Sequence, residues 1–374
     1  MFNKKSVKKN GFQLNGLLKR NGYDWWWHSF TAYNRQTGEE KAFYIEFFIM
    51  NPELCKDKII LGQDKNSKEK ALRPTYLMVN VGSWGKNKKQ LHRFFSLSET
   101  SICKCPISIK AGNCFLDENS TYGEVVVDAK DVKSAMMTDV GRMKWNLKIK
   151  KEIAWNVGYG TSKFFRMINA FEMYWHAEGM KTYFEGEIEY DGEMYDVIPE
   201  KSYGYADKNW GRDFTSPWVW LSSSHLRRKS TNEELLNSAF DIGGGKPKVF
   251  GISLPRKLLA GYYIEGKEIE MNFSKIFHPC ETWFKFKEEK DKVFWRVIQE
   301  NKSYKIEVDI SCLKKDMLFI NYESPKGLKL HNRLFNGGNG IGNMKIFKKK
   351  KKEYILIDEI ECYNVGCEYG EFSK

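Results

Sequence analysis

The sequence predicts an all-β protein built from two successive antiparallel barrel or sandwich domains. Short runs of alternating apolar and polar residues recur along nearly the whole chain at a spacing of roughly ten residues, which is typical of these folds. Aromatic residues make up 15% of the 374 residues, and they favour strands. A chain of this length with 41% hydrophobic residues can fill one large core or two medium ones.

The first half of the chain begins with a predicted hairpin over residues 22–52. Two aromatic runs flank a turn at Gly38, and Pro52 ends the second run. Residues 55–72 are polar and are predicted to form a loop with room for a short helix. Strands are expected next at 75–84, 92–99, 101–117, 123–131 and 141–155. Glycines and aromatics break the pattern at 155–166, which predicts an irregular connection that can form a lid or rim.

The clearest turn signal is Asp191-Gly192, which joins two alternating runs and is typical of a type I′ hairpin turn. This hairpin leads into the segment 204–226, GYADKNWGRDFTSPWVWLSSSHL. Residues 225–237 are the most polar and helix-tolerant stretch of the second half, and they are expected to interrupt the strands. Strands resume at 238–242, 248–254, 261–273, 281–288, 292–300, 304–310 and 317–324. The second half therefore shows the same series of short strands as the first, but the two halves share no repeated sequence.

The segment 204–226 contains most of the side chains that are candidates for catalysis or binding. If residues 203–209 form an extended strand, its alternation places Tyr203, Tyr205, Asp207 and Asn209 on one face and Ala206, Lys208 and Trp210 on the other. Asp207 is thereby separated from the ammonium group beside it. A carboxyl that faces Tyr205 in an aromatic cavity loses hydration, and its pKa rises toward that of an acid protonated near neutral pH.

The block GYADKNWGRDFTSPWVWL resembles the motif of tyrosine, acid, Lys, Asn, Trp and Gly, followed by Trp-x-Trp, that marks the tocopherol cyclase family. The carotenoid 1,2-hydratases are more distant, lipocalin-like relatives of that family. The resemblance continues at Trp175-His176, at 239–245 (AFDIGGG) and at 337–347 (GGNGIGNMKIF). It implies two lipocalin-like antiparallel β domains in tandem, at residues 1–203 and 204–374, with the segment 204–226 at their junction.

The resemblance also implies a reaction, in which a buried carboxylic acid protonates an isoprenoid double bond and a phenol oxygen or water captures the cation. A carbocation forms no hydrogen bonds, and the π faces of aromatic rings can stabilise its charge without them. The acid would be Asp207, with Tyr205 to orient it and His176 as a further catalytic residue. The implied substrate-binding residues are Trp175, Asn209, Trp210, Trp218 and Trp220. The sequence departs from the family in the order of Trp175-His176, which is His-Trp there, and at Ser222 and Ser224, where the family has a Gln and an Asn.

Two functions of different classes fit this block. An enzyme would carry out cofactor-free, acid-promoted cyclisation, hydration or isomerisation of a hydrophobic small molecule, with or without a prenyl chain, and it needs Asp207 within reach of the ligand. A non-catalytic lipocalin-like carrier of a lipophilic ligand needs the same apolar cavity without the acid. A structural role is the alternative for the block itself, with Asp207, Lys208 and Asn209 closing the inter-domain turn by hydrogen bonds and the tryptophans forming core.

Cofactor and metal signatures are missing from the sequence. Its six histidines are dispersed, there is no P-loop or Gly-x-Ser-x-Gly elbow, and the glycines at 243–245 lack the context of a dinucleotide site. The eight cysteines are also dispersed, which predicts reduced thiols in a cytoplasmic protein. Without a secretory segment or a bilayer-length apolar run, the protein is expected to be soluble or at most membrane-peripheral, and its oligomeric state stays open.

The net charge of +13 suggests nucleic acid, but the basic residues are scattered among 48 acidic ones and no nucleic-acid-binding motif is present. The one dense basic run, 348–352, lies between two strand-like stretches and is predicted to be a solvated hairpin loop. The alternative for this run is a contact with phosphate or an anionic membrane. The expected partner is a lipophilic small molecule, with no specific nucleic acid and at most peripheral membrane contact through the basic surface.

Overall fold

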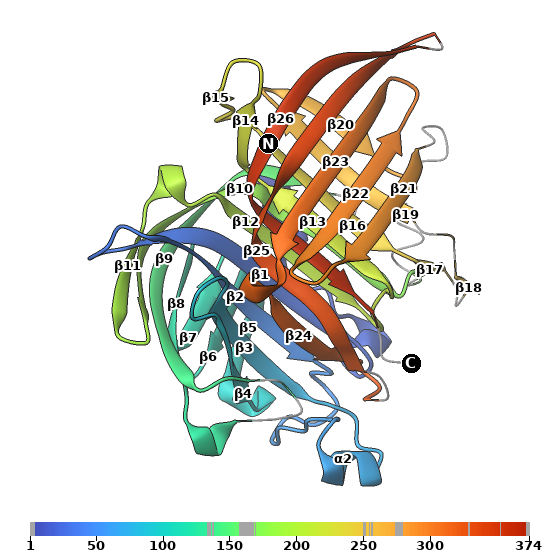
Figure 1. Ribbon diagram of the computed structural model, residues 1–374. Helices are drawn as coiled ribbons and strands as arrows, with labels where there is room; N and C mark the ends of the chain where they lie inside the picture. The colour runs from blue at the N-terminus through green and yellow to red at the C-terminus, as the bar shows by residue number, and fades with distance from the viewer. Residues whose placement is uncertain are drawn as a thin grey trace.

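The computed structural model describes residues 4–132, 136, 138–156, 168, 170–249, 252–253, 255, 257–273, 280–327, 330–351 and 353–371. Nearly all regular structure in these residues is antiparallel β, arranged in two twelve-stranded sheets (Figure 1). The predicted all-β fold with two successive β units is thereby confirmed. The lid or rim predicted at 155–166 lies, from residue 157 on, outside the described residues.

The first sheet contains strands β1 to β12 and curls into a barrel. Its order is β4-β3-β2-β1-β11-β10-β9-β8-β7-β6-β5, and β12 pairs with both β1 and β10. The end strand β4 packs against β8 and β9, so the sheet closes on itself. The strands are β1 Tyr23–Asn34, β2 Glu40–Met50, β3 Tyr76–Ser83, β4 Lys89–Phe95, β5 Thr100–Lys104, β6 Ile107–Ala111, β7 Cys114–Asp117, β8 Ser120–Val127, β9 Gly141–Trp155, β10 Met173–Tyr190, β11 Glu193–Val197 and β12 Gly204–Gly211.

The second sheet is formed by the C-terminal half of the chain. Its order is β20-β19-β16-β13-β26-β25-β23-β22-β21, with β14 paired to β15 and β26 and with β24 paired to β25. The strands are β13 Trp218–Ser223, β14 His225–Arg228, β15 Glu233–Glu234, β16 Ala239–Gly245, β19 Lys257–Ile264, β20 Lys267–Met271, β21 Glu281–Glu288, β22 Lys292–Glu300, β23 Tyr304–Leu313, β24 Leu318–Glu323, β25 Leu330–Lys350 and β26 Glu353–Gly370. A separate small pair is made by β17 Lys248–Val249 and β18 Ile252–Ser253.

Helices are short and few in the described parts of the chain. The α-helices are α1 Lys4–Asn10 and α2 Lys65–Glu69, and the second confirms the short helix predicted in the loop 55–72. The 3-10 helices are η1 Gly16–Lys19, η2 Leu97–Glu99, η3 Ala129–Asp131, η6 Pro199–Lys201 and η7 Lys314–Asp316. No helix among the described residues has the length and apolar character needed to cross a bilayer. All eight cysteines are described, and each is a free thiol.

Two predicted hairpins are confirmed at their turns. Asp191 and Gly192 have φ of 49° and 86° between β10 and β11, as a type I′ turn requires. Gly38 has φ of 71° in the turn between β1 and β2, a left-handed conformation that glycine adopts without strain.

Two local expectations are wrong. Residues 225–237 do not interrupt the strands, since they contain the paired strands β14 and β15. This stretch is polar because the two strands form a short hairpin at the surface. Tyr203 does not belong to the strand face of Asp207. Its φ of 40° turns the chain before β12 begins at Gly204, and its ring stacks on His225 at 3.8 Å.

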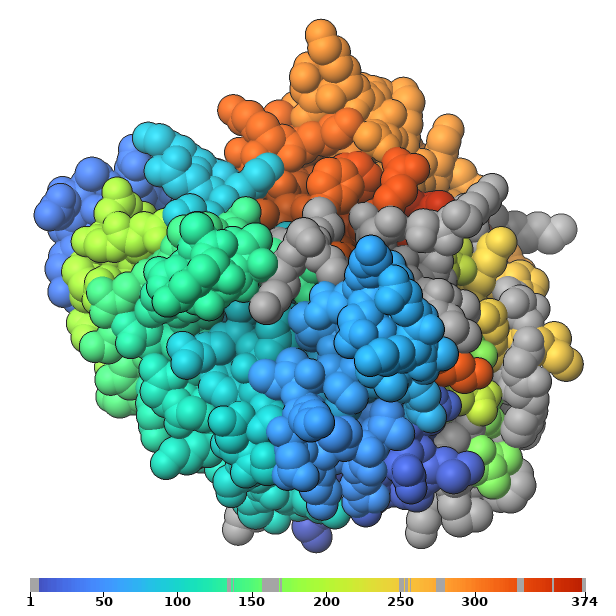
Figure 2. Space-filling model, turned by 90° about the horizontal axis from the view of Figure 1, so that it is seen from below, coloured from blue at the N-terminus to red at the C-terminus, as the bar shows by residue number. Residues whose placement is uncertain are grey.

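The core has three parts, and the third lies between the sheets. One apolar cluster fills the first barrel and one lines the second sheet. The third is rich in tryptophan and tyrosine and draws side chains from β1, β2, β10 and β12 of the first sheet and from β13, β16, β24 and β25 of the second. The chain changes sheet between β12 and β13, at residues 212–217, so β12 lies next to this layer. Seen from below, the first sheet forms most of the surface and the second lies along its upper edge (Figure 2).

Candidate active site

Asp207 lies at the centre of the aromatic layer between the two sheets. Strand β12 pairs with β1 so that Asp207 stands opposite Trp27 and Asn209 opposite Trp25. The carboxyl group is buried, and its Oδ2 accepts hydrogen bonds from Trp175 Nε1 at 2.8 Å and from the Tyr205 hydroxyl at 3.2 Å. The predicted alternation of Tyr205, Asp207 and Asn209 on one strand face is therefore observed.

Lys208 points to the opposite face, as predicted. Its ammonium group pairs with the fully buried Asp24, and it lies 4.1 Å above the ring of Trp26. Asp207 is thus not tied to its neighbour in a salt bridge. The pair of Lys208 and Asp24 stabilises the barrel side of β12 and leaves the other side to Asp207.

Tyr205 connects Asp207 to a second buried acid, Asp241 of β16. Its hydroxyl lies 2.9 Å from Asp241 Oδ2, and Trp220 Nε1 donates to Asp241 Oδ1 at 3.1 Å and to the Tyr205 oxygen at 3.2 Å. A phenol has one hydrogen, so Tyr205 can donate to one of the two carboxyls at a time. The other short contact is then satisfied by a carboxyl proton. The array of Asp207, Tyr205 and Asp241 is therefore arranged to hold at least one proton.

Burial sets the protonation of both acids. It raises the pKa of Asp207 to about 8, although the hydrogen bonds from Trp175 and Tyr205 lower it, and the charge of Glu368 raises it further. Burial and the charge of Asp207 also raise the pKa of Asp241 well above its ordinary value. Near neutral pH, Asp207 is consequently a neutral acid in an apolar wall.

A small inner cavity reaches the Asp207 carboxyl. Its volume is about 20 Å³, room for about one water molecule. Among the described residues, no donor reaches Asp207 Oδ1, and no acceptor reaches the indole nitrogens of Trp25 and Trp27. The lining residues are Trp25, Trp27, Asp207, Trp218, Trp220, Tyr322 and Glu368.

Glu368 of β26 brings a second carboxyl to the inner cavity. It accepts from Trp218 Nε1 at 2.9 Å and from Asn336 Nδ2, both neutral donors. Burial raises its pKa to about 7, while those two hydrogen bonds lower it. Two buried acids with raised pKa values thus share one aromatic cavity.

An outer, apolar pocket of about 80 Å³ adjoins the inner cavity. Trp218 lines both, and Trp175 lines the outer pocket while it donates to Asp207. Gly243 allows this position of Trp175, since a Cβ there would lie 2.9 Å from the indole ring. The outer pocket is lined by Phe171, Met173, Tyr174, Trp175, Thr215, Trp218, Gly243, Gly244, Gly245, Pro247, Lys257, Leu259 and Phe273.

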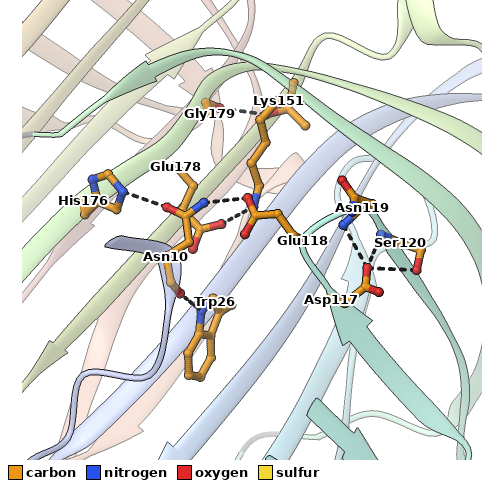
Figure 3. Close-up of polar contacts among 11 residues, drawn as sticks. Asn10, Trp26, Asp117, Glu118, Asn119, Ser120, Lys151, His176, Glu178 and Gly179 are labelled. Atoms are coloured by element: carbon orange, nitrogen blue, oxygen red, sulfur yellow. Dashed lines mark hydrogen bonds and ion pairs between the residues drawn. The ribbon is translucent and has the colours of Figure 1, made fainter. Parts of the chain in front are cut away.

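His176 is separated from this site. It follows Trp175 on β10 and so points to the other face of the sheet, where its Nε2 lies 2.9 Å from Asn10 Oδ1 (Figure 3). Asn10 Nδ2 donates to Glu118, and Lys151 pairs with Glu118 at 2.8 Å and Glu178 at 2.7 Å. Burial, followed by nearby lysines, lowers the pKa of His176 well below its ordinary value. His176 is therefore neutral and is part of a polar network inside the first barrel.

The remaining predicted residues divide between the two faces. Trp218 and Trp220 line the inner cavity. Trp210 lies on the opposite face of β12 from Asp207, where it stacks on Tyr174 with ring centres 5.4 Å apart. Asn209 shares the face of Asp207, but it is fully buried and accepts a hydrogen bond from Tyr23 at 2.8 Å.

Several residues of the site were not predicted from the sequence. Asp241 is the only acid in the strand AFDIGGG, and a single acid in an apolar run indicates a buried carboxyl group. Glu46 lies in a similar run, KAFYIEFFIM, and it accepts from Tyr322 at 3.2 Å at the edge of the cavity. Glu368, Trp25 and Trp27 gave no signal that distinguishes them from surface or core residues. In the described parts of the chain, no group of His, Cys, Asp and Glu is arranged to hold a metal ion.

A family model and several solved structures resemble the chain. The model for tocopherol cyclase-like proteins matches residues 61–370. Kievitone hydratase from Nectria haematococca is similar over 98% of this chain and 95% of its own, with 11% identity and a TM-score of 0.48. CghA, crystallised with Sch210972, is similar over 94% of this chain and 88% of its own, with 10% identity and a TM-score of 0.45. No curated protein sequence matches the chain.

Proposed function

The chain belongs to the tocopherol cyclase-like family, and from that premise we propose that it is an enzyme that protonates a carbon–carbon double bond of a lipophilic substrate. The proposal rests on one observation above all, which is a buried Asp207 whose pKa is raised to about 8 and whose Oδ1 has no donor among the described residues. A general acid has to hold its proton at the working pH and present it to the substrate. The raised pKa of Asp207 and the position of its carboxyl at the inner cavity support this role.

The first step transfers a proton from Asp207 to one alkene carbon. The π electrons form the new C–H bond, and the positive charge remains on the neighbouring carbon. Indole and phenol faces of the inner cavity stabilise that charge by about 0.5–2 kcal/mol each, by analogy with other cation–π contacts. Tyr205 and Trp175 hold Oδ2 of Asp207 during the transfer, so that the carboxylate formed keeps two hydrogen bonds.

The second step forms a C–O bond and releases a proton. An oxygen of the substrate, or water, donates an electron pair to the cation, and its O–H proton passes to a base. Glu368 suits this role because its pKa of about 7 leaves it partly ionised at neutral pH and because it lines the same cavity. The product keeps one proton on carbon and loses one from oxygen, so cyclisation leaves the substrate mass unchanged.

The lining of the two pockets supports our proposal for the class of substrate. The outer pocket is apolar and suits a prenyl chain, while the inner cavity offers two indole N–H groups to a substrate oxygen. The inner cavity has room for about one water molecule, so the reacting group enters only if the wall that Trp218 forms between the two pockets opens. A prenylated phenol or hydroquinone carries both features.

A carrier function is the second candidate. The observation that favours it is the apolar lining of the outer pocket, which would hold a lipophilic molecule without any chemistry. A carrier does not need Asp207. Mass spectrometry of lipophilic material that co-purifies with the protein separates the two functions, because a bound quinol or polyene supports the enzyme and a mixture of fatty acids supports the carrier.

The catalytic test uses a prenylated hydroquinone in D₂O. Protonation by Asp207, exchanged to deuterium, places one stable C–D bond in the cyclised product, which mass spectrometry detects. We expect Asp207→Asn to slow product formation at least about 10²-fold with little change in binding. Asp309→Asn, at an exposed acid of β23, is the matched control and should keep full activity. Equal rates for the two variants would exclude Asp207 as the acid.

A further inference from the structure

The long hairpin of β25 and β26 extends beyond the rest of the second sheet (Figure 1). On one side, the pairing of β23 with β25 ends at Tyr304 and Lys348. On the other side, the pairing of β14 with β26 ends at Arg228 and Ile360. The last described part of the hairpin, residues 348–351 and 353–357, is called the hairpin tip below. It is a two-stranded ribbon that extends past the strands on either side of it.

Four consecutive large residues of the hairpin tip are exposed. Tyr354, Ile355, Leu356 and Ile357 have exposed fractions of 39%, 41%, 48% and 45%. Because successive side chains of a strand point to opposite faces, this run places apolar side chains on both faces of the ribbon. Single exposed apolar residues are common on protein surfaces, but a contiguous group of them indicates a binding surface.

The opposite strand of the hairpin tip is basic. Lys348, Lys350 and Lys351 are exposed, and Lys349 is half-buried and paired with Glu300. Lys348 stands directly across from Ile355. The basic run predicted to be a solvated loop is thus only partly a loop, since β25 continues to Lys350 and the turn begins at Lys351. Residue 352 lies outside the described residues.

We propose that the hairpin tip docks on a lipid bilayer surface that carries anionic headgroups. Isoleucine and leucine side chains enter the boundary between headgroups and acyl chains, and tyrosine favours the headgroup level. Lysines beside them contact the negative headgroups, whose charge complements the excess of +13 on the chain. Lys305 and Lys349 lie 5.2 Å and 5.6 Å from the ring centre of Tyr354. Each of these two lysines is paired with a carboxylate, Glu307 and Glu300, so the positive charge offered to headgroups comes from Lys348, Lys350 and Lys351.

Other occupants fit the hairpin tip less well. A nucleic acid would pair with the lysines but would leave three aliphatic side chains uncovered, and the tip offers one aromatic ring for base stacking. A second copy of the chain would cover the aliphatic residues but would bring two lysine clusters together. A bilayer satisfies both features of the surface. This docking does not depend on the proposed reaction, because the hairpin tip and the inner cavity share no residue.

The test is co-sedimentation of the full chain with vesicles. Phosphatidylcholine vesicles are compared with vesicles that also contain phosphatidylserine, at low and high salt. We expect binding to the anionic vesicles alone and a loss of binding at high salt. Each lysine removed should weaken binding about fivefold, so the triple variant Lys348→Ser, Lys350→Ser, Lys351→Ser should bind about 10²-fold more weakly.

Further variants separate the contributions. Replacing Ile355, Leu356 and Ile357 with serine should abolish binding even though the lysines remain. The matched control replaces Lys144, Lys148 and Lys150, three exposed lysines of β9, and should bind as the wild type does. The proposal is wrong if the wild type ignores anionic vesicles, or if the control loses as much affinity as the lysine variant. It is also wrong if sedimentation shows a dimer that the aliphatic variant dissolves while vesicle binding stays unchanged.

Discussion

Replacement of Asp207 by Asn should change how stability depends on pH. In the unfolded chain Asp207 loses its proton near its ordinary pKa of 3.8, whereas in the folded chain burial raises the pKa to about 8. Between these values the folded state binds more protons than the unfolded state, so the free energy of unfolding falls as pH rises. The slope is about 1.4 kcal/mol per pH unit, or about 6 kcal/mol over the whole interval.

Asparagine has the shape of the neutral acid but does not titrate, so Asp207→Asn removes this slope. The new amide places an NH₂ group where Oδ1 has no donor, which costs about 1–3 kcal/mol if it stays unpaired. At pH 7 the raised pKa of Asp207 lowers the free energy of unfolding of the wild type by about 4 kcal/mol, and the substitution removes this loss. The variant should therefore be at least as stable as the wild type at pH 7. Below pH 4 it should be less stable.

Urea unfolding followed by tryptophan fluorescence between pH 4 and pH 8 measures this directly. Asp24→Asn is the matched control, because it leaves the buried Lys208 without its partner and should cost about 3–5 kcal/mol. If Asp207→Asn is several kcal/mol less stable at pH 7 and keeps the slope of the wild type, Asp207 is an ionised structural clasp and the reasoning fails.

Three further changes test neighbouring parts of the account. Glu368→Gln removes a negative charge from the inner cavity and should lower the pKa of Asp207, as measured by NMR of ¹³C-labelled aspartate; an unchanged pKa would mean that the two carboxyls do not interact. Lys151→Met leaves its two buried carboxylate partners without a cation and should cost about 3–5 kcal/mol at pH 8 but less at pH 5, where Glu178, whose pKa burial raises to about 7, is protonated; an equal loss at both pH values in urea unfolding contradicts the ion pairing. Gly243→Ala puts a Cβ 2.9 Å from the Trp175 ring and should shift that indole away from its hydrogen bond, which ultraviolet resonance Raman spectra report; unchanged indole bands would show that the close approach is tolerated.

The alternation of β12 could be predicted from the sequence because strand geometry fixes it. Successive side chains point to opposite faces, so the separation of Asp207 from Lys208 needed no knowledge of the rest of the fold. The same rule places Trp175 and His176 on opposite faces of β10, which is why both could not serve the same cavity. Trp210 is excluded from the cavity for the same reason.

The other half of the site could not be predicted because it comes from the second sheet. Asp241 and Glu368 reach the aromatic layer only when the second sheet packs on the first, as β16 does on β10 and β13 on β12, and no local pattern reports that packing. The hairpin tip is a further example. Its lysine run was visible in the sequence, but the exposure of Ile355 and Leu356 depends on how far β14 and β23 extend along it.

The proposed role of Asp207 requires its carboxyl group to be protonated at neutral pH, and infrared spectroscopy measures this. An infrared difference spectrum of the wild type minus Asp207→Asn isolates the carbonyl stretch of that one carboxyl group. We expect a neutral carboxylic acid band at pH 7 that disappears as the pH rises through about 8. A carboxylate band at pH 6 and above, with no neutral acid band, would contradict it.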